Sequence, residues 1–357
     1  MDWAKPQYRR AEVNKAGKFL LNNIVNIITS IISKDEEFDR QFSHHVDVID
    51  NFRAVHAFPL NTLQNNLRAH SSVVDTEAVV AQRLKRFTSI LWKLSLFPTM
   101  ELWDMQDIGG CRSIVKDVDK VRQLVNIYKT PSSRIRHKLV HEDDYITHPR
   151  SSGYRSYHLI YRYMSDRNDI YNGLKIEMQI RTLMQHAWAT TVETVDAFTE
   201  QALKSSRGHR DWERFFQLMG TEMALREGTS PVSGTPVDRA ELIRELRDCA
   251  DKLNVKRTLT AFTDALHVTE ATMDAKYFLL SLDASAEQLN INGYKTKELD
   301  KASQKYTEIE RQIRQKGSGD AVLVSVDSIQ NLRRAYPNYF ADTRMFIDIL
   351  DESLKTE

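Results

Sequence analysis

The sequence has few cysteines, no long apolar segment and no excess of charge. Its two cysteines, Cys111 and Cys249, lie far apart, which fits a reducing compartment and excludes a disulfide framework or a cysteine-based metal site. No apolar run is long enough to span a bilayer, and no signal-peptide pattern opens the chain, so we expect a cytoplasmic protein without membrane contact. The net charge of +1 gives no overall basic field, so any binding to nucleic acid depends on local patches.

What is present is enough material for two domains, since the chain has 357 residues of which 41% are hydrophobic. A segment rich in glycine, serine, threonine and proline at 226–237 predicts a linker. We therefore expect one domain at 1–227, a linker at 228–237 and a second domain at 238–357.

A strict alternation over residues 157–163 predicts a strand with aromatic side chains on one face. The segment 149–153 before it has the proline, serines and glycine of a turn. Tyr154, Arg155 and His158 then lie at the mouth of the strand, where a ring and two cationic donors can meet a flat anionic ligand. The alternative is a surface strand with half-buried tyrosines.

Residues 78–96 predict a helix or the edge of one, and they carry only basic charges. Like charges at this spacing repel one another, so a solvated face normally mixes signs. Four cations beside Ser89 indicate a polyphosphate ligand, and a basic surface stripe is the alternative. The cations are Arg83, Lys85, Arg86 and Lys93.

Two carboxylates lie at the edges of different predicted strands. Asp107 opens a strand with two glycines, and Glu177 interrupts the strand 174–180 where alternation does not require a charge. Carboxylates beside a phosphate-binding segment are the groups that Mg²⁺-assisted transfer from a nucleoside triphosphate uses. Helices near 118–128 and 183–199 and a strand at 134–145 complete an alternating α/β pattern.

Two other segments predict structure and carry no catalytic cluster. An amphipathic helix is expected at 12–33, and the HHVD sequence at 44–47 is better explained by a polar helix face than by a metal site. After the linker we expect a small α/β module for binding or regulation. Its expected elements are helix 238–273, strands 276–281 and 288–292, helix 296–316, strand 321–326, and helices 328–335 and 342–354.

Several motifs in order resemble the synthetase domain of the RelA/SpoT alarmone synthetases. They are RLK at 83–85, DIGGCR at 107–112, PRSSGYRSYH at 149–158 and EMQIRT at 177–182, and they cover about a third of the chain. The resemblance implies a nucleotidyltransferase-like α/β (α+β) domain with a mixed sheet flanked by helices. There is no P-loop, so side chains would hold the phosphates. About eighty residues precede the first motif, too few for the hydrolase domain of full-length members, which also disfavours a metal at 44–47.

The resemblance implies a role for each candidate residue on the ATP side. Arg83 and Arg112 would sandwich the adenine by guanidinium stacking. Lys85, Ser89 and Lys93 would bind the triphosphate. Asp107 and Glu177 would hold Mg²⁺, and Glu177 would also take the proton of a 3′-hydroxyl that attacks the β-phosphorus.

On the acceptor side, the resemblance implies that Tyr154 stacks on the acceptor base. Arg150, Arg155 and His158 would lie near the phosphates or sugar of the same molecule. Two positions depart from the family pattern, because Arg150 replaces a lysine and Ser152 stands where guanine-using members have asparagine. Selectivity for GDP or GTP is therefore left open.

The YPNY sequence at 336–339, in a domain after the synthetase, resembles the fused toxin–antitoxin synthetases of phage defence, the CapRel type. This resemblance implies the 3′ CCA end of tRNA as the acceptor, restraint by Tyr336 and Tyr339, and release by a phage protein such as a capsid protein. The basic run Arg134, Arg136 and Lys138 would then grip the tRNA.

Three alternatives stay open. The same chemistry suits a small alarmone synthetase that makes (p)ppGpp or (p)ppApp. A degenerate synthetase could act only as a sensor, although both carboxylates are retained. The two tyrosines could simply pack around a proline-broken helix.

Overall fold

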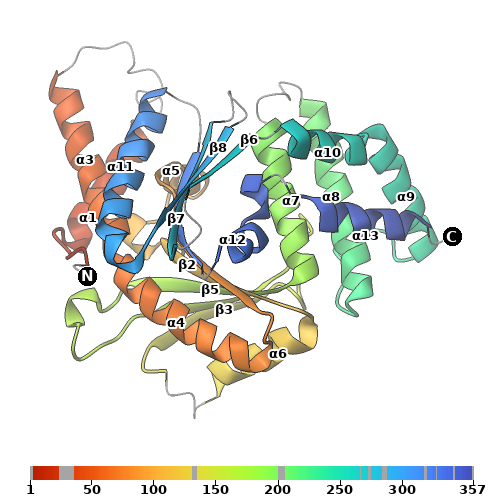
Figure 1. The fold of residues 1–357 in the computed structure, drawn as a ribbon, viewed down its shortest axis with the longest axis horizontal. Coiled ribbons are helices and arrows are strands. Elements are labelled where there is room, and N and C mark those ends of the chain that lie inside the picture. The colour runs from red at the N-terminus through yellow and green to blue at the C-terminus, as the bar shows by residue number, and fades with distance from the viewer. Residues whose placement is uncertain are drawn as a thin grey trace.

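A mixed β-sheet organises the computed structural model (Figure 1). Its strand order is β3-β4-β5-β2-β1-β9-β7-β8-β6. The structure describes residues 3–23, 36–130, 135–199, 206–265, 267–271, 275–283, 288–316, 320–326, 328–340 and 342–355. The strands are β1 (Val79–Leu84), β2 (Gly109–Val115), β3 (Lys138–Asp144), β4 (Tyr157–Arg162), β5 (Lys175–Thr182), β6 (His267–Ala271), β7 (Tyr277–Asp283), β8 (Gln288–Tyr294) and β9 (Asp320–Ser325).

Helices surround this sheet, and within the described ranges none of them combines the length and apolarity that crossing a bilayer requires. They are α1 (Arg10–Asn22), α3 (Glu36–Val55), α4 (Ala57–Val74), α5 (Phe87–Leu96), α6 (Val118–Lys129), α7 (Leu183–Thr199), α8 (Ser206–Arg226), α9 (Arg239–Lys252), α10 (Val255–Ala265), α11 (Leu299–Lys316), α12 (Ile329–Ala335) and α13 (Arg344–Lys355). Short 3₁₀ turns include Leu102–Asp104, Asp169–Tyr171, Thr296–Glu298 and Pro337–Phe340.

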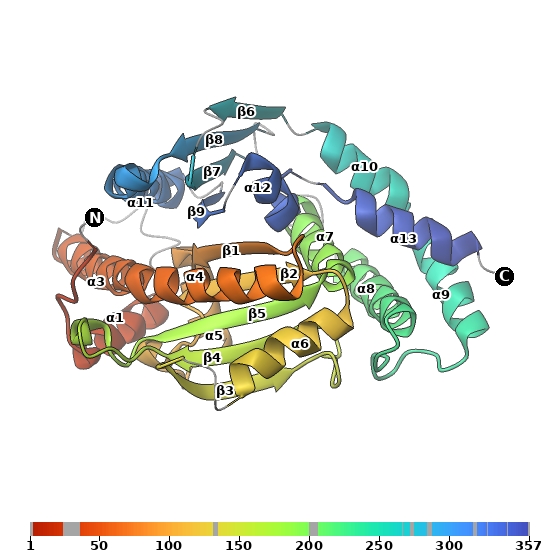
Figure 2. The same ribbon diagram turned by 60° about the horizontal axis from the view of Figure 1, so that its bottom comes forward.

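The two faces of strands β1 to β5 have different coverings, because side chains alternate along each strand. Helices α4 and α6 pack on one face through buried leucines such as Leu63, Leu67 and Leu124 (Figure 2). The opposite face carries Arg83 on β1, Arg112 on β2 and Glu177 on β5, and it is covered by α7, α12 and the 3₁₀ turn after α12. Polar side chains are therefore concentrated on one side of the sheet.

The C-terminal strands continue the same sheet. Strand β9 pairs antiparallel with β1, matching Gln82 with Ser325 and Arg83 with Val324. Helices α9 and α13 share a hydrophobic core with α7 and α8, as the right of Figure 1 shows. The division at 228–237 stays a prediction; residues on its two sides share one sheet and one core.

Several predicted elements are confirmed, including the strands around Asp107 and Glu177, the β7–β8 pair and the helices after them. The predicted helix over 78–96 is wrong at its start, because Val79–Leu84 is strand β1 and α5 begins only at Phe87. Strand β1 has partners on both edges, and those hydrogen bonds override a local helical pattern. The helix predicted over 238–273 also fails at its end, where His267–Ala271 pairs with β8.

The predicted helix over 12–33 is helical as far as Asn22, and residues 24–35 lie outside the described residues. The HHVD segment belongs to α3. There His45 packs against Phe19 with ring centroids 4.3 Å apart, and Asp47 lies 3.6 Å from Arg311. Within the described ranges no cluster of three metal-ligating side chains occurs.

A buried ion cluster joins α11 to the N-terminal helices. Arg53 on α3 donates to both carboxylate oxygens of Glu310, at 2.7 and 3.0 Å, and to the hydroxyl of Tyr306 at 2.7 Å. Its Nε also donates to the backbone carbonyl of Lys85 at 2.9 Å. Arg53 and Glu310 are almost fully buried, so the cluster fixes α11 against the end of β1.

Glu310→Gln should lower the free energy of unfolding by about 3 kcal/mol, because a buried guanidinium loses its main counter-charge. Urea unfolding followed by circular dichroism measures this loss. Glu308→Gln is the matched control, since Glu308 pairs with Lys305 on the exposed face of the same helix and should cost under about 0.5 kcal/mol. Equal losses in the two variants would contradict the role of the cluster.

Candidate active site

A polar cavity lies on the face of the sheet that α7 and α12 cover. Strands β1, β2 and β5 supply most of its walls, and Glu193 of α7 and Tyr336 complete them. Its charged lining residues are Arg83, Lys85, Asp107, Arg112, Glu177, Arg181 and Glu193. Five of the residues predicted for ATP and Mg²⁺ thus line one cavity, although they come from separate motifs.

Asp107 is held between two lysines. Lys85, just after β1, donates to its Oδ2 at 2.8 Å, and Lys93 of α5 donates to its Oδ1 at 2.9 Å. The basic run is therefore not unneutralised in three dimensions, as its sequence suggested, because Asp107 comes from outside the run. Ser89 lies in the first turns of α5 and is half-buried.

Glu177 belongs to a closed ring of hydrogen-bonded side chains. His158 Nδ1 lies 3.1 Å from Glu177 Oε1, and His158 Nε2 lies 2.8 Å from the hydroxyl of Tyr154. Arg181 Nη2 donates to that hydroxyl at 2.9 Å and to Gln179 Oε1 at 2.5 Å. Gln179 Nε2 closes the ring by donating to Glu177 Oε2 at 2.6 Å. Five side chains on adjacent strands and the preceding turn therefore hold one another in place.

The ring fixes protonation states as well as positions. Burial alone would raise the pKa of Glu177, but the charge of His158 and the hydrogen bonds from His158 and Gln179 lower it well below its ordinary value. Burial would lower the pKa of His158, yet Tyr154 and Glu177 raise it to about 9. At neutral pH the ring therefore contains a carboxylate paired with an imidazolium.

The two arginines predicted to sandwich adenine lie on neighbouring strands, and Arg112 already has an aromatic partner. The ring of Tyr336 lies 4.6 Å from the Arg112 guanidinium, and its hydroxyl donates to the carbonyl of Gln82 at 3.1 Å. Arg83 Nη1 is buried with no hydrogen-bond partner. Tyr336 is fully buried and lines the same cavity. Tyr336 therefore covers one face of the Arg112 guanidinium, on which a base could otherwise stack.

Glu193 provides the counter-charge for these arginines. Burial raises the pKa of its carboxyl, but Arg83, Arg112 and Arg181 lower it overall. Conversely, burial lowers the pKa of Arg83, and Glu193 is the strongest of the groups that raise it overall. Tyr339 is buried beside Tyr336, with ring centroids 6.5 Å apart, and it contributes to the same raised pKa of Arg83.

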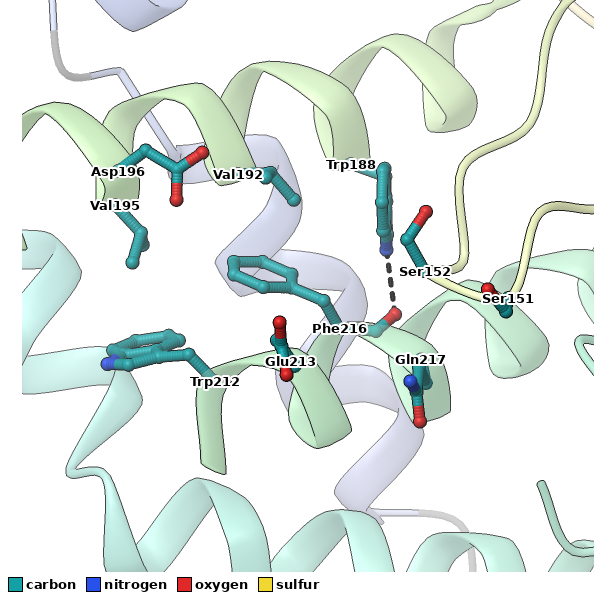
Figure 3. Close-up of a pocket in the computed structure, with 10 residues that line it drawn as sticks. All are labelled: Ser151, Ser152, Trp188, Val192, Val195, Asp196, Trp212, Glu213, Phe216 and Gln217. Carbon is teal, nitrogen blue, oxygen red and sulfur yellow. Dashed lines mark hydrogen bonds between the residues drawn. The ribbon is translucent and has the colours of Figure 1, made fainter. Parts of the chain in front are cut away.

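A second hollow lies beside the turn before β4, and its lining includes none of the four residues predicted for the acceptor. The ring of Tyr154 contacts Trp188 edge-on, with centroids 6.3 Å apart. Trp188 lies beside a pocket whose wall includes Ser151 and Ser152 of the turn and Trp212 of α8 (Figure 3). An aromatic pocket next to the turn can accept a flat base.

Arg150 and Arg155 have different surroundings. Arg150 is exposed and stacks on Tyr145 at 4.4 Å. Arg155 is buried and paired with Glu227 at 2.6 Å. Its side chain therefore does not face a ligand, in contrast to the prediction. Of the basic run proposed for tRNA, Arg136 and Lys138 are exposed, and Arg134 lies outside the described residues.

Some residues of the site were not predicted. Gln179 and Arg181 follow Glu177 at intervals of two along β5, and this period could have placed all three on one face. Glu193 reaches the cavity from α7, where no sequence signal points to it, whereas Tyr336 at the end of α12 was expected from the YPNY sequence.

The donor set of the cavity fits Mg²⁺. Two carboxylates, Asp107 and Glu177, line one polar cavity, and Mg²⁺ in nucleotide sites commonly takes one or two carboxylates together with phosphate oxygens. All four carboxylate oxygens contact lysine, histidine or glutamine donors. A cation would compete with those donors for them.

His158 should titrate near pH 9 in an NMR titration of the imidazole signals, well above its ordinary 6.5. Because the folded pKa is raised, the charged form contributes stability fully below pH 6.5, and this contribution is lost as the pH rises through about 9. Glu177→Gln removes one of the charges responsible and should lower the pKa of His158. A titration near 6.5 in the wild type would contradict the ion pair.

Comparison with known proteins agrees with this geometry. Residues 82–199 match the family described as a region found in RelA/SpoT proteins. The GTP pyrophosphokinases YjbM and YwaC of Bacillus subtilis are 35% identical over 113 residues and 30% identical over 131 residues. These segments cover 31% and 35% of this chain and 52% and 59% of the relatives, so the chain spans little more than half their length.

Among solved structures, small alarmone synthetase 1 from Bacillus subtilis bound to its product pppGpp aligns with a TM-score of 0.40 and 25% identity. The alignment covers 54% of this chain and 92% of that one. The matched family region begins within β1 and contains strands β2 to β5 and the whole of α7. The region that matches the family, residues 82–199, supplies every lining residue of the cavity except Tyr336.

Proposed function

We propose that this protein is a pyrophosphokinase that transfers the β,γ-pyrophosphate of ATP to a 3′-hydroxyl. One observation supports this most directly, the cavity in which Asp107 and Glu177 face four cationic side chains of the RelA/SpoT region. The cationic side chains can bind the phosphates of a triphosphate, and the two carboxylates can bind the Mg²⁺ that accompanies it. Bound Mg²⁺ would neutralise charge on the transferring phosphates.

In this proposal the residues of the chain act mainly by position and charge. Lys85 and Lys93 bind the triphosphate in exchange for Asp107. Glu177, oriented by Gln179 and His158, accepts the proton of the attacking hydroxyl. Its lowered pKa makes it a weak base, so alignment must contribute more of the rate than proton abstraction does.

The acceptor is best assigned as a guanine or adenine nucleotide. Both curated relatives are named GTP pyrophosphokinases, so a product of the (p)ppGpp or (p)ppApp type suits the matched region. The pocket beside Ser152 has aromatic walls on which a base could stack, formed by Trp188 and Trp212 among others. Ser152 lacks the amide that the family pattern has there, so selectivity between the two bases depends on other groups.

The 3′ CCA end of tRNA is the second candidate, in a self-inhibited defence toxin released by a phage protein. The exposed Arg136 and Lys138 on and before the edge strand β3 are the observation that favours it, since edge cations can contact a phosphate backbone. Incubation with γ-labelled ATP and GDP, GTP, ATP or tRNA in turn distinguishes the candidates. Label on tRNA alone would favour the second, and label on nucleotides alone the first.

The same assay tests the chemistry. Asp107→Asn and Glu177→Gln should each reduce transfer at least about 10³-fold to every acceptor, because each removes a charge without changing volume. Asp104→Asn is the control, since Asp104 is a carboxylate of the same region that contacts Arg10 and Lys175 outside the cavity. Retention of wild-type rates by either active-site variant would refute the assignment.

We also propose that Tyr336 holds the enzyme inactive by occupying the adenine position on Arg112. Two observations support this: the ring of Tyr336 lies 4.6 Å from the Arg112 guanidinium, and Tyr336 lines the cavity. Tyr339 would act through Tyr336 and Arg83. A trigger protein would then have to bind better to the form in which the ring is withdrawn.

Tyr336→Leu should lower the KM for ATP by about 30-fold, because a desolvated cation–π contact of about 2 kcal/mol no longer competes with the base. Tyr336→Phe keeps the ring and should remain inhibited. Phe340→Leu controls for loss of core packing, since Phe340 is a buried neighbour that stacks on Arg333 instead. Steady-state kinetics at varied ATP measure these values, and an unchanged KM in Tyr336→Leu would contradict the plug.

A further inference from the structure

The turn before β4, which we call the acceptor turn (residues 149–154), is pressed against α8. Gly153 has φ of +99°, and a Cβ placed on it would lie 2.7 Å from the carbonyl oxygen of Phe216. A Cβ on Gly220 of α8 would in turn lie 2.9 Å from Gly153. Two glycines therefore permit backbone contact between the turn and a helix that lies outside the matched family region.

Directly after the acceptor turn, Arg155 is anchored in the protein interior. Its Nη1 donates to Glu227 at 2.6 Å and to the hydroxyl of Thr229 at 3.2 Å. The side chain of Arg155 is 1% exposed and that of Glu227 is 7% exposed. The remaining nitrogens of Arg155, Nε and Nη2, are buried without a hydrogen-bond partner. Glu227 is thus the carboxylate that pairs with Arg155 in the described part of the chain, and the position of Arg155 depends on it.

Glu227 also binds the strand that carries Glu177. Its Oε1 accepts a short hydrogen bond from the hydroxyl of Thr182, the last residue of β5. Its Oε2 accepts from Gln185 Nε2 of α7 at 3.1 Å. One carboxylate therefore joins the segment after the acceptor turn to the end of strand β5.

Glu227 follows directly after α8, whose last turns contact the C-terminal helices. Glu222 of α8 is fully buried and pairs with Arg239 of α9 at 3.0 Å. It also accepts from the hydroxyl of Ser353 of α13 at 3.1 Å. The end of α8 that precedes Glu227 is thus held against α9 and α13.

We propose that Glu227 is a positioning residue that sets the distance between the acceptor turn and Glu177. The proposal rests on the pyrophosphokinase function proposed above. Neither Glu227 nor its partners Arg155, Thr182 and Gln185 line the ATP cavity, so we expect its effect to be larger on the acceptor than on ATP. A 3′-hydroxyl held by the turn then stays aligned with Glu177 only while the Arg155–Glu227 pair is intact.

Glu227→Gln tests this, since it removes the charge and keeps the shape. The acceptor used is the one that takes the label in the assay above. In steady-state kinetics its kcat/KM should fall on the order of 10²-fold, while the KM for ATP stays within about twofold of the wild type. Glu227→Asp, which keeps the charge, should recover part of the loss. Hydrogen exchange at the amides of residues 150–156 should be faster in Glu227→Gln without any nucleotide present.

Glu245→Gln is the matched control, because it removes the carboxylate partner of Arg214 between α8 and α9 without touching the acceptor turn. It should change neither the kinetics nor the exchange of the turn. Unchanged exchange and kinetics in folded Glu227→Gln would overturn the proposal, as would equal rises in both KM values. If the wild type labels no acceptor, the proposed function fails, and the exchange measurement still decides the positioning role.

Discussion

Strand β1 is hydrogen-bonded on both edges, and the rest of the structure depends on this arrangement. On one edge it pairs with β2, which carries Arg112, and on the other with β9 from the C-terminal part. The carbonyl of Lys85 at the end of β1 is fixed by Arg53, which α11 holds through Glu310. The geometry of the residues proposed to bind phosphate is therefore set jointly by both parts of the chain.

The three carboxylates of the cavity each have cationic neighbours in this structure, whereas Arg83 Nη1 is buried without a hydrogen-bond partner. Asp107 lies between two lysines, Glu177 between a histidine and a glutamine, and Glu193 among three arginines. In the proposed function, the phosphates would replace the carboxylates as partners of the cationic side chains. The cation would replace the lysine, histidine and glutamine donors as the partner of Asp107 and Glu177. Such exchange costs little net charge desolvation, because both states are paired.

Much of the site could be predicted from the sequence, because its motifs are local. Glu177 and Asp107 interrupt apolar strands, and a charge in such a place indicates a function. The contacts that complete the site could not be predicted. Glu193 and Glu227 lie in segments without a pattern, and they reach the cavity or the segment after the acceptor turn only through the packing of α7 and α8. Strand β1 was mistaken for a helix because its second edge is paired with a strand about 240 residues later.

In the proposed function, the ring of Tyr336 competes with the adenine of ATP, because both would stack on the guanidinium of Arg112. A tethered ring has a constant effective concentration, on the order of millimolar or above for a short connection, whereas a soluble base has the concentration of its cellular pool. The fraction of Arg112 covered by Tyr336 then depends on the ratio of the effective concentration of the ring to the concentration of the soluble base. It does not depend on the concentration of the protein. Overexpression would multiply the number of molecules and leave the fraction with an open Arg112 unchanged.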